Sequence, residues 1–329
     1  MNKTKIDWAD YTWNPITGCK HCCDYCYARK QSQRFSGDIR LNKGHTELYR
    51  MQEDIYVLDS PFPAPNSRTL AFPFGFEPTY HRYRLDFPEK KKTPANIFVG
   101  SMSDIFGSWI PDEIICEIFA ACEKGPQNNY LFLTKNYSRY AELHEKGLLP
   151  VRDNMWYGIS VTDNSGAWRG EFLPLQGYNT FVSIEPMLEE IEPYNIPAAQ
   201  WIIIGALTNS RKKIVPQKEW IDRIVTAADG KIPIFMKGSL KDVMGADLIQ
   251  QYPDKLIITE HYSQKRKAKL WDHCSICSKY LPMKDMTALL YRSGRGESAK
   301  KLGYACNECF GKLKQELNQN CKKGSKEDE

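Results

Sequence analysis

Apolar residues gather in short, nearly continuous runs through the middle of the chain, and polar or helical stretches separate these runs. The runs are rich in β-branched and aromatic residues. Near-continuous hydrophobicity is typical of parallel strands that are covered on both faces. The expected strands are Asn96–Gly100, Tyr130–Thr134, Met155–Val161, Thr180–Ile184, Trp201–Gly205 and Ile232–Met236.

Helical periodicity fills several of the intervals between these runs. In Pro111–Lys124, apolar residues such as Ile114 and Ile118 share one face, and Pro216–Asp229 behaves in the same way. Alternation of strands and helices over residues 96–240 predicts an α/β fold with a parallel sheet. A further strand before the first cysteines gives about seven strands, one short of a TIM barrel. Periodicity alone does not distinguish a partial (β/α) barrel from an open sheet.

Residues 55–95 interrupt this alternation with a stretch rich in proline and aromatic residues. We expect a long, ordered insertion, which serves either as a lid or binding loop or as structural packing. Its aromatic residues are candidates for stacking on a base, although core packing is the commoner role for such side chains. These residues are Phe72, Phe74, Phe76, Tyr80 and Tyr83.

Composition narrows the class of protein. The chain has 329 residues, of which 42% are hydrophobic and 26% charged, so it can bury a large core. No apolar run approaches the roughly 18–20 residues that span a bilayer, and the opening residues lack the apolar core of a secretion signal. We therefore expect a cytoplasmic protein with no membrane contact. Residues 261–329 carry a net charge of +7 against −2 for the rest, which favours an anionic partner for that segment.

Eight of the eleven cysteines fall into two clusters. Clustered cysteines in a long intracellular chain indicate metal binding more often than disulfides. Two metal sites are therefore expected, one toward each end of the sequence. Cys116 and Cys122 fall in an expected helix and are interpreted as packing residues, and Cys321 as an incidental thiol. The clustered cysteines are Cys19, Cys22, Cys23 and Cys26, followed by Cys274, Cys277, Cys306 and Cys309.

The N-terminal group contains the spacing C-x3-C-x2-C at Cys19, Cys23 and Cys26, with Tyr25 before the last cysteine. Three thiolates on a four-iron cluster leave one iron open, and an open coordination position is typical of a catalytic metal site. Cys22 allows two alternatives. It could replace Cys23 in a C-x2-C-x3-C pattern, or all four thiols could hold a structural zinc or iron ion. Tyr25 favours the first pattern.

With this cysteine loop, the chain resembles the radical S-adenosylmethionine (SAM) superfamily. The segments TWNPITGC, FVGSMSDIF, FLTKN, GISVTDN, FVSIEPM and WIIIG are similar to those of an uncharacterised, often phage-associated radical-SAM-like family. The YCYA ending is similar to the cluster loop of spore photoproduct lyase, a DNA-repair member of the superfamily. This resemblance covers roughly residues 7–240. It implies a partial parallel (β/α) barrel of the radical SAM type.

The resemblance also implies a chemistry. A [4Fe-4S] cluster on Cys19, Cys23 and Cys26 would bind SAM and cleave it reductively with an electron from an external one-electron donor. The 5′-deoxyadenosyl radical so formed would take a hydrogen atom from a substrate.

Polar residues follow the expected strands, where ligands of parallel α/β barrels are bound. Ser101, Ser103 and Asp104 would meet the SAM amino group, although a turn or helix cap explains them equally well. Lys135 would balance the SAM carboxylate, and a solvated strand-end charge is the alternative. The remaining expected SAM contacts are Tyr25, Ser160 and Asp163 (both for the ribose hydroxyls) and Glu185, with Lys237 following the last strand.

The C-terminal group consists of two C-x2-C pairs, Cys274–Cys277 and Cys306–Cys309, around an expected hairpin with a glycine turn. Paired knuckles of this kind predict a zinc site, and a helix carrying the last ligands resembles a treble-clef finger. An auxiliary iron–sulfur cluster is the rival, and His273 adjoins the first ligand. Small metal domains do not fold without their metal. The expected basic surface comprises Lys279, Lys284, Arg292, Arg295, Lys300 and Lys301.

These patterns predict a barrel domain over 1–264, a linker at Lys265–Lys269 within a zinc domain at 265–321, and a disordered tail at 322–329. The leading interpretation is a radical SAM enzyme acting on a nucleic acid or a nucleotide-derived base, in modification or repair. One alternative is a non-catalytic nucleic-acid-binding protein with two structural metal sites. Another keeps the radical chemistry but gives it a protein or peptide partner.

Overall fold

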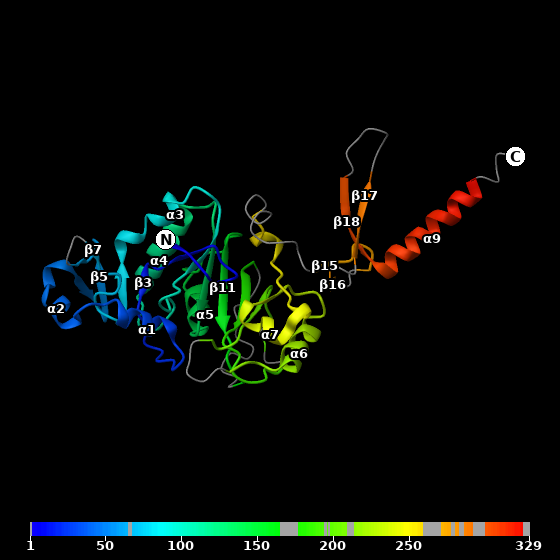
Figure 1. Cartoon of the computed structure of the whole chain (residues 1–329). Helices are drawn as coiled ribbons and strands as arrows, with labels where there is room; N and C mark the ends of the chain where they lie inside the picture. Colours follow the sequence, from blue (N-terminus) through cyan, green and yellow to red (C-terminus); the bar gives the residue numbers. More distant parts are fainter. Residues whose placement is uncertain are drawn as a thin grey trace. The chain divides into compact units, whose positions relative to one another are not determined.

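The computed structural model describes residues 2–64, 68–164, 177–193, 196, 198–208, 214–258, 271–277, 280–282, 286–291 and 300–324. The chain divides into two compact units (Figure 1). The larger consists of Met1–Leu248 and Tyr252–Ile258, and the smaller of Ile249–Gln251 and Thr259–Glu329. The expected linker at 265–269 lies outside the described residues.

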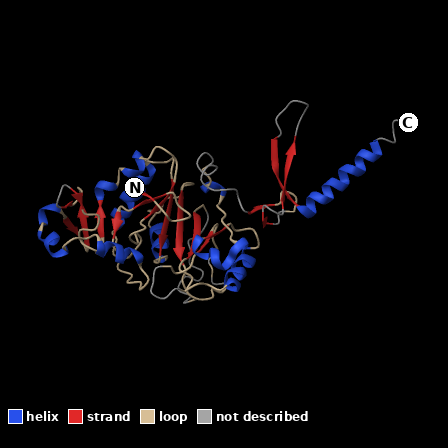
Figure 2. Cartoon of the chain, viewed as in Figure 1, coloured by secondary structure: helices blue, strands red, loops and turns tan. Residues whose placement is uncertain are grey.

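One eight-stranded sheet forms the centre of the larger unit, in the order β1-β2-β9-β10-β11-β12-β13-β14 (Figure 2). Every pair from β2 to β14 is parallel, and β1 joins β2 antiparallel at one edge. The strands are β1 Asn2–Lys3, β2 Tyr11–Trp13, β9 Asn96–Val99, β10 Asn129–Thr134, β11 Met155–Ser160, β12 Asn179–Ile184, β13 Ile202–Ile204 and β14 Ile234–Met236.

The six strands expected between residues 96 and 236 are thus confirmed, and β2 is the expected strand before the cysteines. Each parallel strand pairs with the next along the chain, which is the topology of consecutive β-α units. Among the described strands, β1 and β14 are the two edges and do not pair with each other, so no closed barrel is formed. The fold is a mixed α/β fold built on a parallel sheet.

Helices of the larger unit follow the expected pattern. Helix α4 carries Asp112 and Glu113 in its first turn, where carboxylates interact favourably with the helix dipole. It buries the apolar stripe that includes Ile114 and Ile118, and also Cys122. The helices are α1 Tyr27–Arg34, α2 Ile39–Gly44, α3 Phe87–Lys90, α4 Asp112–Glu123, α5 Ser138–Glu145, α6 Lys218–Ala228 and α7 Lys241–Met244.

Large aromatic side chains fill the core beside the sheet. Trp8, Phe98 and Trp201 belong to one buried cluster, and the ring centroids of Trp8 and Phe98 are 4.7 Å apart. The close packing extends to the backbone at Gly158 on β11, where a Cβ atom would lie 2.3 Å from Phe181. Such density is typical of a well-formed protein interior.

The insertion is an ordered substructure. It contributes to a second, four-stranded sheet in the order β3-β8-β5-β4 and to a hairpin of β6 and β7. Phe72, Phe74 and Tyr80 are buried, so core packing is their role in this structure. These elements are β3 Ile16–Thr17, β4 Arg50–Gln52, β5 Ile55–Leu58, β6 Pro63–Ala64, β7 Arg68–Thr69 and β8 Thr79–His81.

The smaller unit consists of two hairpins and a helix. Strands β15 (Trp271–His273) and β16 (Tyr280–Pro282) pair antiparallel, as do β17 (Met286–Tyr291) and β18 (Lys300–Cys306). Helix α9 follows directly over Asn307–Gly324. The helix therefore extends into the tail that was expected to be disordered from residue 322, and residues 325–329 lie outside the described part.

Among the described residues, no helix combines the length and the apolar character that crossing a bilayer requires.

Candidate active site and a four-cysteine metal site

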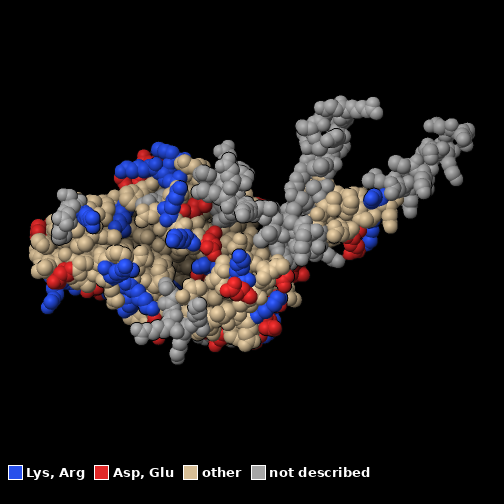
Figure 3. Space-filling model, viewed as in Figure 1, with Lys and Arg blue, Asp and Glu red and all other residues tan. Residues whose placement is uncertain are grey.

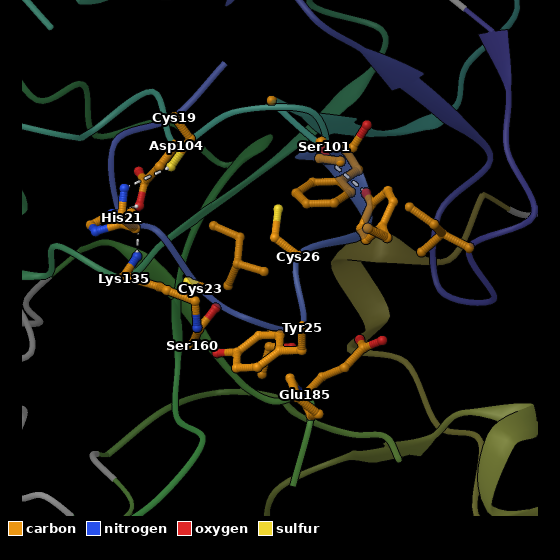
Figure 4. A pocket seen from close by; sticks show the side chains of 18 of the residues that line it. Cys19, His21, Cys23, Tyr25, Cys26, Ser101, Asp104, Lys135, Ser160 and Glu185 are labelled. Carbon is orange, nitrogen blue, oxygen red and sulfur yellow. Dashed lines mark hydrogen bonds and ion pairs between the residues drawn. The ribbon is translucent and has the colours of Figure 1, made fainter. Parts of the chain in front are cut away.

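A cavity of about 310 Å³ lies at the carboxyl ends of the parallel strands (Figure 4). Its volume is in the range of small-molecule binding sites. Seven of the eight expected SAM contacts line it. The exception is Asp163, whose carboxylate accepts a hydrogen bond from the Thr162 hydroxyl at 3.1 Å. The seven are Tyr25, Ser101, Ser103, Asp104, Lys135, Ser160 and Glu185.

The structure separates the four N-terminal cysteines. Cys19, Cys23 and Cys26 all line the cavity, whereas Cys22 is exposed and is not part of the lining. Cys22 has a backbone φ of 56°, in the left-handed region. A hydrogen bond with the Cys22 side chain raises the pKa of Arg29. The geometry therefore groups the three thiols of the C-x3-C-x2-C spacing.

Tight packing against the insertion holds the start of the cysteine loop. Gly18 has a φ of 86°, and a Cβ atom there would lie 2.3 Å from the carbonyl oxygen of Glu77. The Gly18 amide donates to the Met102 carbonyl at 2.9 Å, and the Cys19 amide donates to the Phe76 carbonyl at 3.2 Å. Only glycine can approach another backbone this closely with a positive φ.

The end of the cysteine loop is the start of helix α1. Cys26 is the N-cap of this helix, and its Sγ accepts a hydrogen bond from the Arg29 amide at 3.4 Å. The first turn of α1 thus fixes the position of the Cys26 side chain at the cavity wall.

Cys19 lies in a less polar environment. Burial raises the pKa of the Cys19 thiol to about 12, although the His21 amide, 3.5 Å from its Sγ, acts in the opposite direction. The negative charges of Asp104, Cys23 and Cys26 raise it further. Without a cation the Cys19 thiol therefore keeps its proton at neutral pH, and ligation of a metal releases that proton.

Asp104 is the centre of a buried hydrogen-bond network. Its Oδ2 lies 2.7 Å from His21 Nε2 and accepts from the Lys135 amide at 2.9 Å. The Thr134 hydroxyl donates to the same carboxylate at 2.8 Å, and the Phe106 amide donates at 3.0 Å. These protein donors occupy both oxygens. Asp104 thus connects the cysteine loop to the end of β10, and it also lines the cavity as an expected SAM contact.

We expect Asp104→Asn to lower the free energy of unfolding by about 2 kcal/mol, because hydrogen bonds to a buried charged group are worth roughly that much. It should also reduce the iron that the chain retains after reconstitution. Urea unfolding and iron analysis measure the two effects. The matched control is Asp54→Asn, which removes an exposed carboxylate paired with Lys20 and should change neither quantity. Equal behaviour of the two variants would contradict the role of Asp104.

Several hydroxyls of the cavity have no partner in the protein. The Ser103 and Ser183 hydroxyls are buried and unpaired among the described residues, and both residues line the cavity. Ser183 stands beside Ser160 in the register of β12 and β11. Ser101 differs, because its hydroxyl donates to Asn14 Oδ1 at 3.2 Å. Buried polar atoms without partners are costly, so this wall of the cavity suits a polar ligand.

Two lysines at strand ends have definite neighbours. Lys135 Nζ lies 5.5 Å from the centroid of the Tyr25 ring, a cation–π contact. Lys237, after β14, forms an ion pair with Glu185, after β12. Gly205 lies between them, where a Cβ atom would be 3.0 Å from Lys237 Cδ. The charge of Glu185 in the cavity wall is therefore balanced by Lys237, which also lines the cavity.

Sequence reasoning missed His21, Tyr27 and Ser183 as cavity residues. His21 had a usable signal, since it stands between two clustered cysteines. Tyr27 and Ser183 had none that distinguishes them from ordinary helix and strand residues. Phe76 is the one insertion aromatic that lines the cavity, and Arg29 lies over its ring at 5.2 Å.

In the smaller unit, the ligand atoms of Cys274, Cys277, Cys306 and Cys309 all lie within 4.8 Å of one another. The Sγ atoms of Cys277 and Cys306 are 3.9 Å apart. The Cys306 amide donates to Cys274 Sγ at 3.3 Å. Although burial raises the pKa of the Cys274 thiol, backbone amides outweigh it and lower that pKa to about 6. This four-cysteine group can hold a metal ion.

Fold and site together define an α/β protein with a cysteine-lined cavity in the larger unit and a four-cysteine group in the smaller unit that can hold a metal ion. The chain belongs to the family described as "Protein of unknown function (DUF5131)", which matches residues 3–272. No curated protein matches it. A cysteine-to-serine mutant of spore photoproduct lyase is a similar solved structure, with 13% identity and a TM-score of 0.37 over 97% of this chain and 74% of that one. A likeness this distant carries no conclusion about activity.

Proposed function

We propose that the protein is a radical SAM enzyme. The observation that carries this proposal is that Cys19, Cys23 and Cys26 line one cavity together with the polar strand ends, while Cys22 does not. A ligand-sized space beside three thiols suits a metal cluster with an open coordination position.

The donor set fits a [4Fe-4S] cluster. Cys19, Cys23 and Cys26 would hold it, since thiolates are the usual ligands of iron–sulfur clusters. Amide groups of His21 and Arg29 already donate toward Cys19 and Cys26. When bound, the cluster would supply the electron that cleaves SAM reductively to the 5′-deoxyadenosyl radical, which acts on the substrate.

The cavity residues would bind and orient SAM. The hydroxyls of Ser103 and Ser183 offer hydrogen bonds that the protein leaves unused. Lys135, held over Tyr25, would balance a carboxylate, and Ser160 would meet a ribose hydroxyl. Glu185, paired with Lys237, would act as a polar anchor without adding net charge to the wall.

The proposed metal of the smaller unit is zinc. Four thiolates in tetrahedral geometry with Zn–S bonds of about 2.3 Å place sulfur atoms about 3.8 Å apart. The Sγ atoms of Cys277 and Cys306 lie 3.9 Å apart, which agrees with this value. A knuckle, a hairpin and a helix carrying Cys309 in its first turn support a treble-clef arrangement.

The proposed substrate is a nucleic acid or a nucleotide-derived base. The net charge of +7 over residues 261–329 supports an anionic partner. Most residues of the expected basic surface, including Lys279 and Arg295, lie outside the described residues. The side chains of Lys300 and Lys301 are likewise not described.

The test is anaerobic reconstitution with iron and sulfide, followed by dithionite and SAM. We expect 5′-deoxyadenosine to form, as measured by chromatography with mass spectrometry. A protein with a filled cluster that forms none would contradict the proposal. That result would leave a nucleic-acid-binding protein with two structural metal sites as the better interpretation.

A further inference from the structure

Helix α1 leads away from the cavity with a basic, partly aromatic surface. Residues 27–44, which include helices α1 and α2, contain five Lys or Arg residues and one acidic residue, Asp38. Figure 3 shows positive side chains gathered over the region of α1. The helix starts at the cavity, because Cys26 is its N-cap and both Cys26 and Tyr27 line the cavity wall.

Helical spacing sorts these residues by face. Ala28 and Ser32, four residues apart, are buried against the protein. Tyr27, Lys30 and Arg34 follow at spacings of three and four residues, so they form one stripe beside the buried face. This stripe runs from the cavity rim along the whole length of α1.

Large apolar side chains are exposed on the same segment. Tyr27 is 40% exposed, Phe35 at the end of α1 is 52% exposed, and Leu41 on α2 is 68% exposed. Tyr27 lines the cavity, and Phe35 is at the other end of the helix that starts there. Exposed apolar groups on one segment mark an interaction site more often than scattered ones do. Aromatic rings interleaved with cations suit a partner with both bases and phosphates.

The cations of this surface differ in their partners. Lys43 pairs with Glu77 at 2.7 Å. Arg34 instead lies over the ring of Phe35, 5.4 Å from its centroid. In the part of the chain that the structure describes, no carboxylate pairs with Arg34 or with the exposed Arg40. Their charge is therefore available to an anionic partner.

From these observations we propose that the α1–α2 surface, defined by Tyr27, Lys30, Arg34, Phe35 and Arg40, docks a single-stranded nucleic acid whose strand leads to the cavity. Phosphates contact the arginines, and a base stacks on Phe35. This deepens the proposed function by naming a polymeric, single-stranded substrate. Duplex is disfavoured, because its bases are already stacked and cannot cover the exposed ring.

The experiment measures fluorescence anisotropy of labelled oligonucleotides with the as-purified full chain, without SAM or reductant. Its arms are single-stranded DNA, single-stranded RNA and duplex DNA, each over a series of salt concentrations. We expect at least one of the two single strands to bind more tightly than the duplex. Whichever single strand binds more tightly shows whether the docked nucleic acid is DNA or RNA. Equal or tighter binding of the duplex would overturn the proposal.

Two variants locate the surface. Arg34→Ala/Arg40→Ala removes two phosphate contacts and should reduce the magnitude of the negative slope of log K against log salt by about 1.4, as expected for single strands. Phe35→Ala should weaken binding roughly five- to 150-fold while leaving that slope unchanged. Lys124→Ala/Lys241→Ala removes two exposed charges elsewhere on the larger unit and is the matched control.

An arginine variant that behaves like this control would overturn the docking surface. Failure of this inference is distinguishable from failure of the proposed function. Binding is measured without radical chemistry, whereas formation of 5′-deoxyadenosine from SAM needs no docked strand to be detected.

Discussion

Cys23→Ala is expected to abolish cluster binding and to reduce formation of 5′-deoxyadenosine to the level of the metal-free protein. Cys23 is the middle proposed ligand of a loop whose ends are fixed by Gly18 at one side and by the cap of α1 at the other. Without it only two of the thiols that line the cavity remain, and the exposed Cys22 is not among them. Iron and sulfide content, electron paramagnetic resonance after reduction, and product formation measure the loss.

Cys22→Ala is the matched control, one residue away in the same loop. Its thiol is exposed and outside the cavity, so iron content and product formation should stay at the wild-type level. Should Cys22→Ala lose the cluster as completely as Cys23→Ala does, the ligand set would include Cys22. A four-thiol structural site would then be correct, whereas loss of the cluster in Cys22→Ala with its retention in Cys23→Ala would support the C-x2-C-x3-C pattern.

The second large effect is expected on removal of the metal from the smaller unit. Cys306→Ser should abolish zinc binding and unfold this unit while the larger unit stays folded. The buried part of this core among the described residues is small, consisting of Cys274, Ala305 and Cys306. So little apolar burial does not offset chain entropy, whereas a structural zinc supplies about 10–16 kcal/mol of apparent binding free energy.

Elemental analysis and limited proteolysis of the full chain measure this effect. We expect loss of one zinc per chain and new cleavage within residues 271–324. Cys116→Ser, a half-buried thiol of α4, is the control and should retain both zinc and protease resistance. Loss of iron and sulfide instead of zinc would show that the site holds an auxiliary cluster. Resistance of metal-free Cys306→Ser to cleavage would show that the fold does not depend on a metal.

Much of the central sheet could be predicted from the sequence, because its strands are buried on both faces. Runs such as Tyr130–Thr134 are apolar throughout, and the structure places the strand at Asn129–Thr134. Whether the sheet closes into a barrel could not be predicted, because closure depends on whether its first and last strands pair with each other. The antiparallel β1 at one edge is a two-residue strand with exposed side chains, and such a strand leaves no pattern.

The strands of the insertion were not predictable for the same reason. Strands β6 and β7 have two residues each, β8 has three and β5 has four. A period of two needs more residues before it is visible. The abundance of aromatics did indicate packing, and Phe74 stacks on Tyr56 with centroids 3.9 Å apart.

Those residues of the candidate site that directly follow a parallel strand could be predicted from their position in the sequence. Residues directly after parallel strands meet at one edge, so Ser101, Lys135 and Glu185 line the same cavity. What each side chain at that edge of the sheet does depends on the residues that it contacts. Asp104 meets His21 across 83 residues of sequence, and no local pattern encodes that contact.

The contact between Gly18 and the insertion has an evolutionary consequence. Because the cysteine loop continues from β3, and β3 pairs with β8 of the insertion, the loop and the insertion form one inherited unit. A lineage that shortened residues 55–95 would lose the support of Cys19 at the same step. Any change to the insertion that moved the backbone of Phe76 and Glu77 would therefore also disturb the cysteine loop.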